Sequence, residues 1–82
     1  QNAEIFNGLG WSYFYSNRYS EATTFFQQAI DLKPSYIDAH FGLGRSYEEQ
    51  GLLTEALAAF QTVKQLDPTY PNIDEAIMRV SP

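Results

Sequence analysis

Cysteine is absent from the 82 residues, and histidine occurs once, at His40. The missing thiols exclude disulfides, thiolate zinc sites and cysteine nucleophiles. A single imidazole leaves too few ligands for an ordinary zinc site, so we expect neither a metal nor another cofactor. No apolar run approaches the ~20 residues that a membrane-spanning helix needs, and we therefore expect no membrane span.

Positive charge is scarce and scattered. The chain has 5 Lys+Arg against 10 Asp+Glu, a net charge of −5. Its cations are spread along the whole length, at Arg18, Lys33, Arg45, Lys64 and Arg79. Binding to a phosphate backbone requires clustered cations, so we expect no nucleic-acid partner. The composition does not indicate a compartment.

Aromatic residues, by contrast, are abundant: 6 Phe, 6 Tyr and 1 Trp make up 16% of the chain. With 44% apolar and 18% charged residues, the composition is that of a globular protein. The length allows one small domain over residues 1–82. So many aromatic side chains require either a dense core or an exposed binding surface.

The sequence repeats itself without a gap, at a fixed interval that takes Gly8 to Gly42 and Tyr36 to Tyr70. We call this interval the repeat period. Twelve pairs of residues are identical, and in the first copy they are Gly8-Leu9-Gly10, Ser12-Tyr13, Glu21-Ala22, Phe26-Gln27, Leu32, Pro34 and Tyr36. The chain therefore holds two copies of one unit, followed by a short remainder over residues 71–82.

Each copy has the pattern of two helices joined by a turn. The first helix of each copy has apolar or small residues on one face, namely Phe6, Leu9, Gly10 and Tyr13, and then His40, Leu43, Gly44 and Tyr47. The second helix has Ala22, Phe26, Ala29 and Ile30, and then Ala56, Phe60 and Val63. Turns are expected at Asn17-Arg18 and at Gly51.

Capping residues indicate where these helices begin and end. Ser20 and Thr54 stand where an N-cap is expected, each followed by Glu in the first turn. Pro34 and Pro68 close the two units, because the residue before proline resists helical geometry. Residues 35–38, Ser-Tyr-Ile-Asp, predict a capping box that opens the second copy.

Glycine occurs inside the first helix of both copies, at Gly10 and Gly44. Glycine in a helix costs roughly 1 kcal/mol against alanine. The repeated position therefore predicts a close approach of the second helix, with no room for a Cβ. We expect Ala22 and Ala56 to face these glycines, and the phenylalanines one turn further on to fill the space.

This spacing resembles the tetratricopeptide repeat, a 34-residue helix–turn–helix unit. The matching residues are Leu9-Gly10, Tyr13, Ala22, Phe26, Ala29 and Pro34, and in the second copy Leu43-Gly44, Tyr47, Ala56, Phe60 and Pro68. The departures are Phe6 and His40 at the usual Trp position, and Val63 at a usual Ala position. The resemblance implies an all-α fold, an α-solenoid of two antiparallel units over about residues 2–35 and 36–69. Its concave face would be lined mainly by the first helices and would typically bind peptides or partner proteins.

The remainder predicts one more helix, with apolar residues at i, i+3, i+4 and i+7, which are Ile73, Ala76, Ile77 and Val80. Its apolar face is offset by about a quarter turn from that of the repeats, at ~100° per residue. We interpret it as a capping helix over about residues 71–80 that covers the end of the second unit. A truncated third repeat is the alternative.

Nothing in the chain predicts catalysis. His40 falls on the internal face of its helix, as a structural histidine does, and acidic pairs such as Glu48-Glu49 are typical of a solvated helix surface. The Gly8-x-Gly10 motif lies within a helix and recurs, so it is interpreted as a packing feature rather than a phosphate-binding loop. We therefore expect that the chain is not an enzyme.

A second stripe runs beside the core face of the first helices, and the resemblance places it in the concave groove. We predict that the partner-binding residues are Asn7, Trp11, Phe14, Phe41, Arg45 and Glu48, with Arg79 added by the last helix. Trp, Phe and Arg are the residue types that anchor protein interfaces. As alternatives, Trp11 and Phe14 pack against Phe41 as a core between the repeats, or the groove is covered by another copy or a further repeat.

Some members of the resembled family hold the C-terminal carboxylate of chaperone tails with Lys, Asn and Arg. This chain has Asn7 at one such position but Trp11, Gly42, Asn72 and Ala76 at the others. We therefore expect no carboxylate clamp, and a hydrophobic or mixed ligand instead. The predicted function is a protein–protein interaction module that binds a peptide or partner segment in the groove. The alternative is a structural spacer or a self-assembling, homo-oligomeric repeat of a larger protein.

Overall fold

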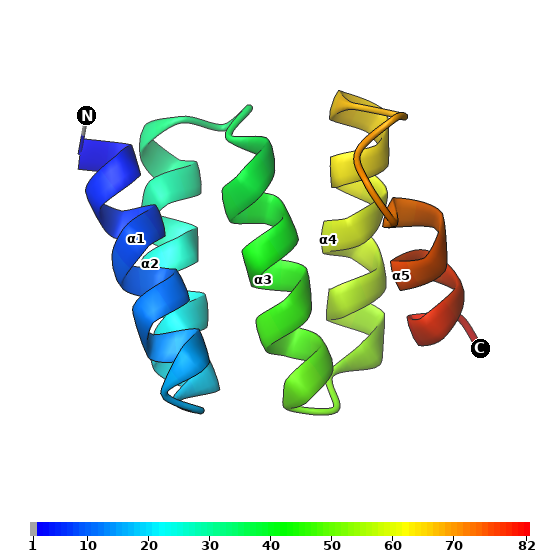
Figure 1. The fold of residues 1–82 in the computed structure, drawn as a ribbon, viewed down its shortest axis with the longest axis horizontal. Coiled ribbons are helices and arrows are strands. Elements are labelled where there is room, and N and C mark those ends of the chain that lie inside the picture. The colour runs from blue at the N-terminus through cyan, green and yellow to red at the C-terminus, as the bar shows by residue number, and fades with distance from the viewer. Residues whose placement is uncertain (1) are drawn as a thin grey trace.

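The computed structural model describes residues 2–82, which contain five α-helices joined by short connections (Figure 1). The helices are α1 (Asn2–Tyr15), α2 (Tyr19–Leu32), α3 (Ile37–Glu49), α4 (Leu53–Leu66) and α5 (Ile73–Val80). No strand occurs within these residues, so the predicted all-α class is confirmed. The longest helices have 14 residues, and none in this part of the chain can traverse a bilayer.

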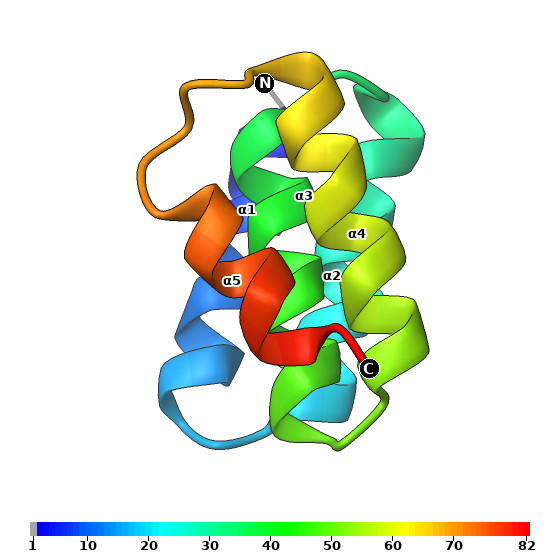
Figure 2. The same ribbon diagram turned by 90° about the vertical axis from the view of Figure 1, so that its right-hand side faces the viewer.

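The helices form two antiparallel hairpins that stack side by side. α1 packs on α2 and α3 packs on α4, while α3 also packs on α2 and α5 packs on α4. Because α1 also contacts α3, the first helices of the two units form one layer, which α5 extends, and α2 and α4 form the other (Figure 2). We call α1, α3 and α5 the inner helices. This arrangement is the predicted α-solenoid of two helix–turn–helix units with a terminal helix.

The repeat period of the sequence is also a period of the backbone. α2 and α4 begin and end at equivalent positions of the two copies. The turn inside each unit has one residue with positive φ, Asn17 at 62° and Gly51 at 76°, where asparagine and glycine are tolerated best. The N–H of the following residue donates to the carbonyl of Tyr13 in one unit and of Tyr47 in the other, at 2.9 Å each. The same turn therefore reverses the chain twice.

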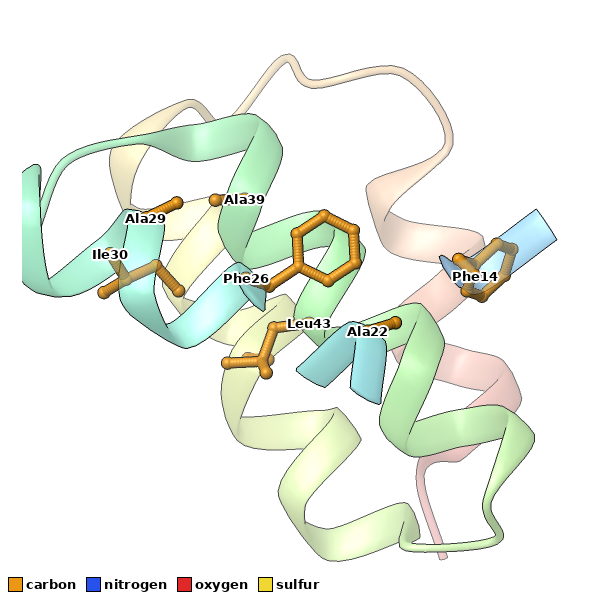
Figure 3. Packing of buried hydrophobic residues seen from close by; sticks show 8 residues of the cluster. Phe14, Ala22, Phe26, Ala29, Ile30, Ala39 and Leu43 are labelled. Carbon is orange, nitrogen blue, oxygen red and sulfur yellow. The ribbon is translucent and has the colours of Figure 1, made fainter. Parts of the chain in front are cut away.

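The glycines of α1 and α3 make room for two fully buried phenylalanine rings. A Cβ at Gly10 would lie 2.7 Å from the Phe26 ring, and one at Gly44 would lie 2.6 Å from the Phe60 ring. Gly42 approaches Phe26 in the same way from α3. Figure 3 shows the Phe26 ring among the other residues of its cluster, with Ala39 and Leu43 of α3 nearby. Both rings have 0% exposure. The predicted close approach is confirmed, and the ring itself, rather than an alanine, covers each glycine.

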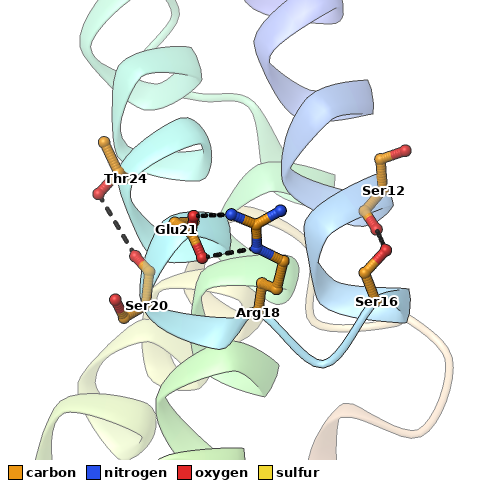
Figure 4. Close-up of polar contacts among 6 residues, drawn as sticks. All are labelled: Ser12, Ser16, Arg18, Ser20, Glu21 and Thr24. Atoms are coloured by element: carbon orange, nitrogen blue, oxygen red, sulfur yellow. Dashed lines mark hydrogen bonds and ion pairs between the residues drawn. The ribbon is translucent and has the colours of Figure 1, made fainter.

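The predicted N-caps of the second helices are wrong. α2 and α4 begin two residues before the start that a cap at Ser20 or Thr54 requires, and neither has a side-chain cap. The Ser20 carbonyl instead accepts a hydrogen bond from Thr24 Oγ1 at 3.3 Å, and Arg18 pairs with Glu21 in the first turn (Figure 4). The preceding turn, closed by its own backbone hydrogen bonds, sets these helix starts.

The terminal helix α5 covers the open end of the second unit. Its buried residues pack against α4 and are Ile73, Ala76 and Val80. They follow buried positions of α3 by one repeat period, namely Ala39, Gly42 and Ser46. The predicted offset refers to the face that holds Gly10 and Gly44, whereas the buried face of α5 corresponds to the face with which α3 packs on α2, so α5 packs in the register of a third unit. Met78 stands at the position of Gly44 and is 75% exposed, so a further second helix could not approach α5 as closely.

Candidate functional site

Asp38, in the first turn of α3, joins this helix to α1 and to the connection between α4 and α5. Its Oδ2 accepts hydrogen bonds from Asn7 Nδ2 and Trp11 Nε1 of α1, both at 2.9 Å. Its Oδ1 accepts one from the hydroxyl of Tyr70, just before α5, at 3.2 Å. The predicted capping box is therefore wrong, because the N-cap of α3 is Tyr36 and no side chain caps the helix. The carboxylate instead fixes α1 and the α4–α5 connection relative to α3.

Trp11 is half-buried, and its ring is held on several sides. It meets the Phe26 ring edge-on at a centroid distance of 5.1 Å and the Phe14 ring at 5.4 Å. Tyr15 stacks on it at 5.8 Å, and the indole N–H donates to Asp38. The orientation of Trp11 is therefore fixed before any ligand arrives, while part of its surface stays open to solvent.

Phe14 and Arg45 form one contact between α1 and α3. Phe14 is 6% exposed and belongs to the core cluster around Phe26, so little of its surface is available to a partner. The Arg45 guanidinium lies 5.1 Å from the centroid of the Phe14 ring, in cation–π geometry. Arg45 and Trp11 therefore lie against the same ring, as their shared stripe predicts. No carboxylate in residues 2–82 forms an ion pair with Arg45.

Phe41 is also half-buried, but it packs within the second unit. Its ring lies 5.0 Å from that of Tyr70 and 5.6 Å from that of Phe60. Trp11 and Phe14 belong to the cluster around Phe26, which also contains Ala39 and Leu43 of α3, and Phe41 belongs to the cluster around Phe60. The two clusters adjoin, since Tyr47 packs against both. Trp11 and Phe14 thus take part in packing between the repeats, as in the alternative interpretation, but Phe41 lies in the other cluster.

Glu48 of α3 and Arg79 of α5 bind each other. Arg79 Nη2 donates to Glu48 Oε1 at 2.9 Å, and Arg79 Nε donates to the other carboxylate oxygen. This forked pair lies at the surface, with 49% of the arginine and 18% of the glutamate side chain exposed. The structure thus brings these two predicted site residues together, but each side chain is already paired with the opposite charge of the other.

Two tyrosines have raised pKa values because of their surroundings. Burial, followed by the charge and the hydrogen bond of Asp38, raises the pKa of Tyr70 to about 12. Burial and the charges of Glu4 and Asp38 raise the pKa of Tyr36, which precedes Tyr70 by one repeat period. The raised pKa of Tyr70 agrees with its hydroxyl donating to Asp38.

The positions of the expected polar clamp are occupied by other contacts. The Asn7 amide nitrogen donates to Asp38, and its carbonyl oxygen is buried with no hydrogen-bond partner in the described residues. Gly42 lies under the Phe26 ring, and Ala76 is 1% exposed. None of these side chains offers a positive charge to a carboxylate.

His40 does not take part in this site. Its Nε2 lies 2.8 Å from the carbonyl oxygen of Pro34, a contact between the first turn of α3 and the loop that precedes the helix. Within residues 2–82, no group of three or more His, Asp or Glu side chains could hold a metal ion. This contact agrees with the structural interpretation of the histidine.

Sequence reasoning missed Tyr70 altogether and assigned the wrong contact to Asp38. A signal was present, since Tyr36 and Tyr70 are identical residues one repeat period apart. Each tyrosine follows the proline that closes a unit and precedes the next inner helix. A polar residue on that helix was therefore a candidate partner for the tyrosine hydroxyl.

Comparisons with known proteins agree with this geometry. A family model described as tetratricopeptide repeat matches residues 7–71. No curated protein sequence matches the chain. The first TPR of Spaghetti (RPAP3), bound to the HSP90 peptide SRMEEVD, superposes with a TM-score of 0.94 at 20% identity, over 96% of this chain and 63% of that one.

Two further solved structures are similar. The second TPR domain of human RPAP3, in complex with the HSP70 peptide SGPTIEEVD, has a TM-score of 0.92 at 29% identity, over 96% of this chain and 66% of that one. A mutant of MamA has a TM-score of 0.87 at 22% identity, over 98% of this chain and 44% of that one. The chain thus spans about two thirds of the length of the first two structures and less than half of the third.

Proposed function

Because the chain belongs to the tetratricopeptide repeat family, we propose that it is a protein–protein interaction module that binds a peptide or partner segment in the concave groove of its inner helices. In this role the chain supplies recognition and carries out no catalysis. The segment lies along α1, α3 and α5 and contacts Trp11, Phe41 and Arg45. Phe14 supports the site from below rather than touching the ligand.

Two structurally similar domains support the class of this function. The first TPR of Spaghetti (RPAP3) and the second TPR domain of human RPAP3 are complexes with chaperone peptides, and both peptides end in EEVD. Our chain has no cation at the expected clamp positions, among them Trp11 and Gly42. A ligand held through its C-terminal carboxylate therefore fits this chain poorly.

The charge of Arg45 is the observation that carries the proposal. Three other charged residues of the inner helices are already bound, since Glu48 pairs with Arg79 and Asp38 accepts three hydrogen bonds. Arg45 rests on an aromatic ring and has no ion-pair partner in the described residues. A ligand that places a carboxylate or carbonyl oxygen beside it completes this arrangement.

The apolar part of the ligand follows from the rings on either side. Trp11 and Phe41 lie in adjoining clusters along the inner helices, and both are half-buried. Rings held by packing lose little conformational freedom on binding, which favours their use as anchors. The fitting segment is therefore mixed, with apolar side chains for the rings and a hydrogen-bond acceptor for Arg45.

A selected peptide tests this assignment. A random peptide library is displayed against the immobilised chain, and the recovered peptide is synthesised and titrated by calorimetry. Arg45→Glu reverses the charge at the centre of the site, and we expect a loss of affinity of at least tenfold, or ~1.4 kcal/mol. Arg18→Glu is the matched control, because Arg18 is exposed and pairs with Glu21 at the α1–α2 turn.

Both variants are first checked for helicity by circular dichroism. Equal affinity of the peptide for the parent and Arg45→Glu, with the fold intact, would contradict the site. The peptide SGPTIEEVD is titrated in parallel. Saturable binding that depends on its free C-terminal carboxylate would contradict the exclusion of a clamp.

A further inference from the structure

One helix face occurs three times along the inner helices, each time one repeat period further on. We call it the stacking face. It consists of Ile5, Gly8, Leu9 and Ser12 on α1, of Ala39, Gly42, Leu43 and Ser46 on α3, and of Ile73, Ala76, Ile77 and Val80 on α5. On α1 and α3 the Gly-Leu pair and the serine are identical.

Two of the three stacking faces are covered within the chain. The α3 face packs on α2 and the α5 face packs on α4. No helix within residues 2–82 covers the α1 face, because α1 lies at one end of this stack and α5 at the other (Figure 1). Accordingly Ile5 is 61% and Leu9 38% exposed, whereas Leu43 is 7% exposed.

Gly8 shows what is missing from the α1 face. A Cβ at Gly42 would collide with the Phe26 ring, whereas no atom of another helix in the described part of the chain lies within 4 Å of a Cβ at Gly8. The packing explanation of the Gly8-x-Gly10 motif therefore holds for Gly10 but not for Gly8. A glycine that costs helix stability and meets no neighbour leaves a socket for an aromatic ring from outside the chain.

The chain itself contains the complementary surface, on α4. Phe60 lies there between small residues, Ala56 and Val63, and it follows Phe26 of α2 by one repeat period. At present α5 covers this surface. α5 has 8 residues against the 14 of α1, and it offers Ala76 where α1 offers Gly8. The stacking face of α1 therefore resembles the α3 face that packs on α2 more closely than the stacking face of α5 does.

We propose that the stacking face of α1 docks on α4 of a second copy of this chain when α5 moves aside. α5 is then a plug that keeps the end of the stack closed. Besides its buried residues, it is held by the exposed ion pairs Lys64–Asp74 and Arg79–Glu48, which are weak restraints in water. This contact joins two different surfaces, α1 of one copy and α4 of the next. It is therefore a head-to-tail contact, and each added copy presents a free surface to which another can bind.

The proposal is tested by displacing α5 from α4 and measuring the molar mass of the protein in solution. The double variant Ile73→Asp/Val80→Asp places charges on the buried side of α5, and Met78→Asp is the control on its exposed side. In sedimentation we expect the double variant to exceed twice the 9.3 kDa of one chain as concentration rises. Met78→Asp is expected to behave like the parent, with α5 docked and far less association.

A third substitution identifies the surface that is used. Adding Leu9→Asp to the double variant is expected to return the mass to that of one chain. The matched control is Leu52→Asp in the α3–α4 turn, since Leu52 is 40% exposed, close to the 38% of Leu9. A helical double variant that remains monomeric, or one that associates regardless of Leu9→Asp, would overturn the proposal.

If the double variant loses its helicity, the same contact is measured in the intact chain. A synthetic peptide of residues 52–67, which contains α4, is titrated against the labelled chain. Chemical-shift changes of the Gly8 and Leu9 amide signals support docking on α1. Unchanged shifts at peptide concentrations up to its solubility limit contradict it.

Discussion

Two glycine-to-alanine substitutions separate packing from helix propensity in this chain. Gly8 and Gly44 both lie in the interior of inner helices. An added methyl group at Gly8 meets no atom of another helix of residues 2–82 within 4 Å, whereas at Gly44 it would lie 2.6 Å from the Phe60 ring. The Phe60 side chain is fully buried and has no free direction in which to move.

The magnitudes follow from these distances. Alanine is favoured over glycine in a helix by about 0.8–1.0 kcal/mol, and this gain applies to both sites. Overpacking of a filled core costs about 1–3 kcal/mol, and this applies only to Gly44→Ala. We therefore expect Gly8→Ala to raise the free energy of unfolding. The free energy of unfolding of Gly44→Ala should be about 1–3 kcal/mol lower than that of Gly8→Ala, because the gain in helix propensity is common to both variants.

Urea unfolding followed by far-ultraviolet circular dichroism measures this difference. In a domain of this size 1 kcal/mol corresponds to roughly 4–8 °C in Tm, so thermal melts serve as a second readout. Two variants of equal stability would refute the placement of the helix–helix contact. Gly44→Val is expected to be less stable than Gly44→Ala, since a larger side chain enters the same space.

Two further predictions concern the polar contacts of the inner helices. Asp38→Ala leaves three donors without their acceptor and should lower the free energy of unfolding by about 1–3 kcal/mol in urea melts; a loss no larger than that of Asp31→Ala, an exposed site on α2, would contradict this. Burial and Asp38 raise the pKa of Tyr70 to about 12, whereas an unfolded tyrosine ionises near pH 10. The stabilisation from this shift is therefore complete below pH 10 and is lost as the pH rises towards 12. Melting temperatures across this window should fall less steeply for Tyr70→Phe than for the parent, and parallel curves would refute the assignment.

The sequence repeat was sufficient to predict the fold, because packing repeats with the sequence. Identical Gly, Ala and Phe residues at a fixed spacing require the same helix–helix contact in both units. The position of α5 could not be predicted from its few identities with α3. Its register became evident only when Ala76, at the Gly42 position, was seen to face α4.

The candidate site was less predictable, for a physical reason. A carboxylate near a helix start satisfies the pattern of a capping box, but a nearby indole or phenol competes for it. Asp38 binds Trp11 and Tyr70, which are 27 and 32 residues away. Such a choice depends on how the inner helices meet, and local spacing does not contain that information. For the same reason, the pairing of Glu48 with Arg79 was not foreseen.

The most direct test of the central claim is a chemical-shift footprint of a selected peptide on the labelled chain. We expect the indole signal of Trp11 and the backbone signals around Phe41 and Arg45 to move together and saturate. The outer side of α4, where Gln61, Lys64 and Gln65 line a shallow depression, should stay unchanged. Saturable shifts confined to that outer side, with the Trp11 signal unmoved, would contradict the claim that the inner helices form the binding surface.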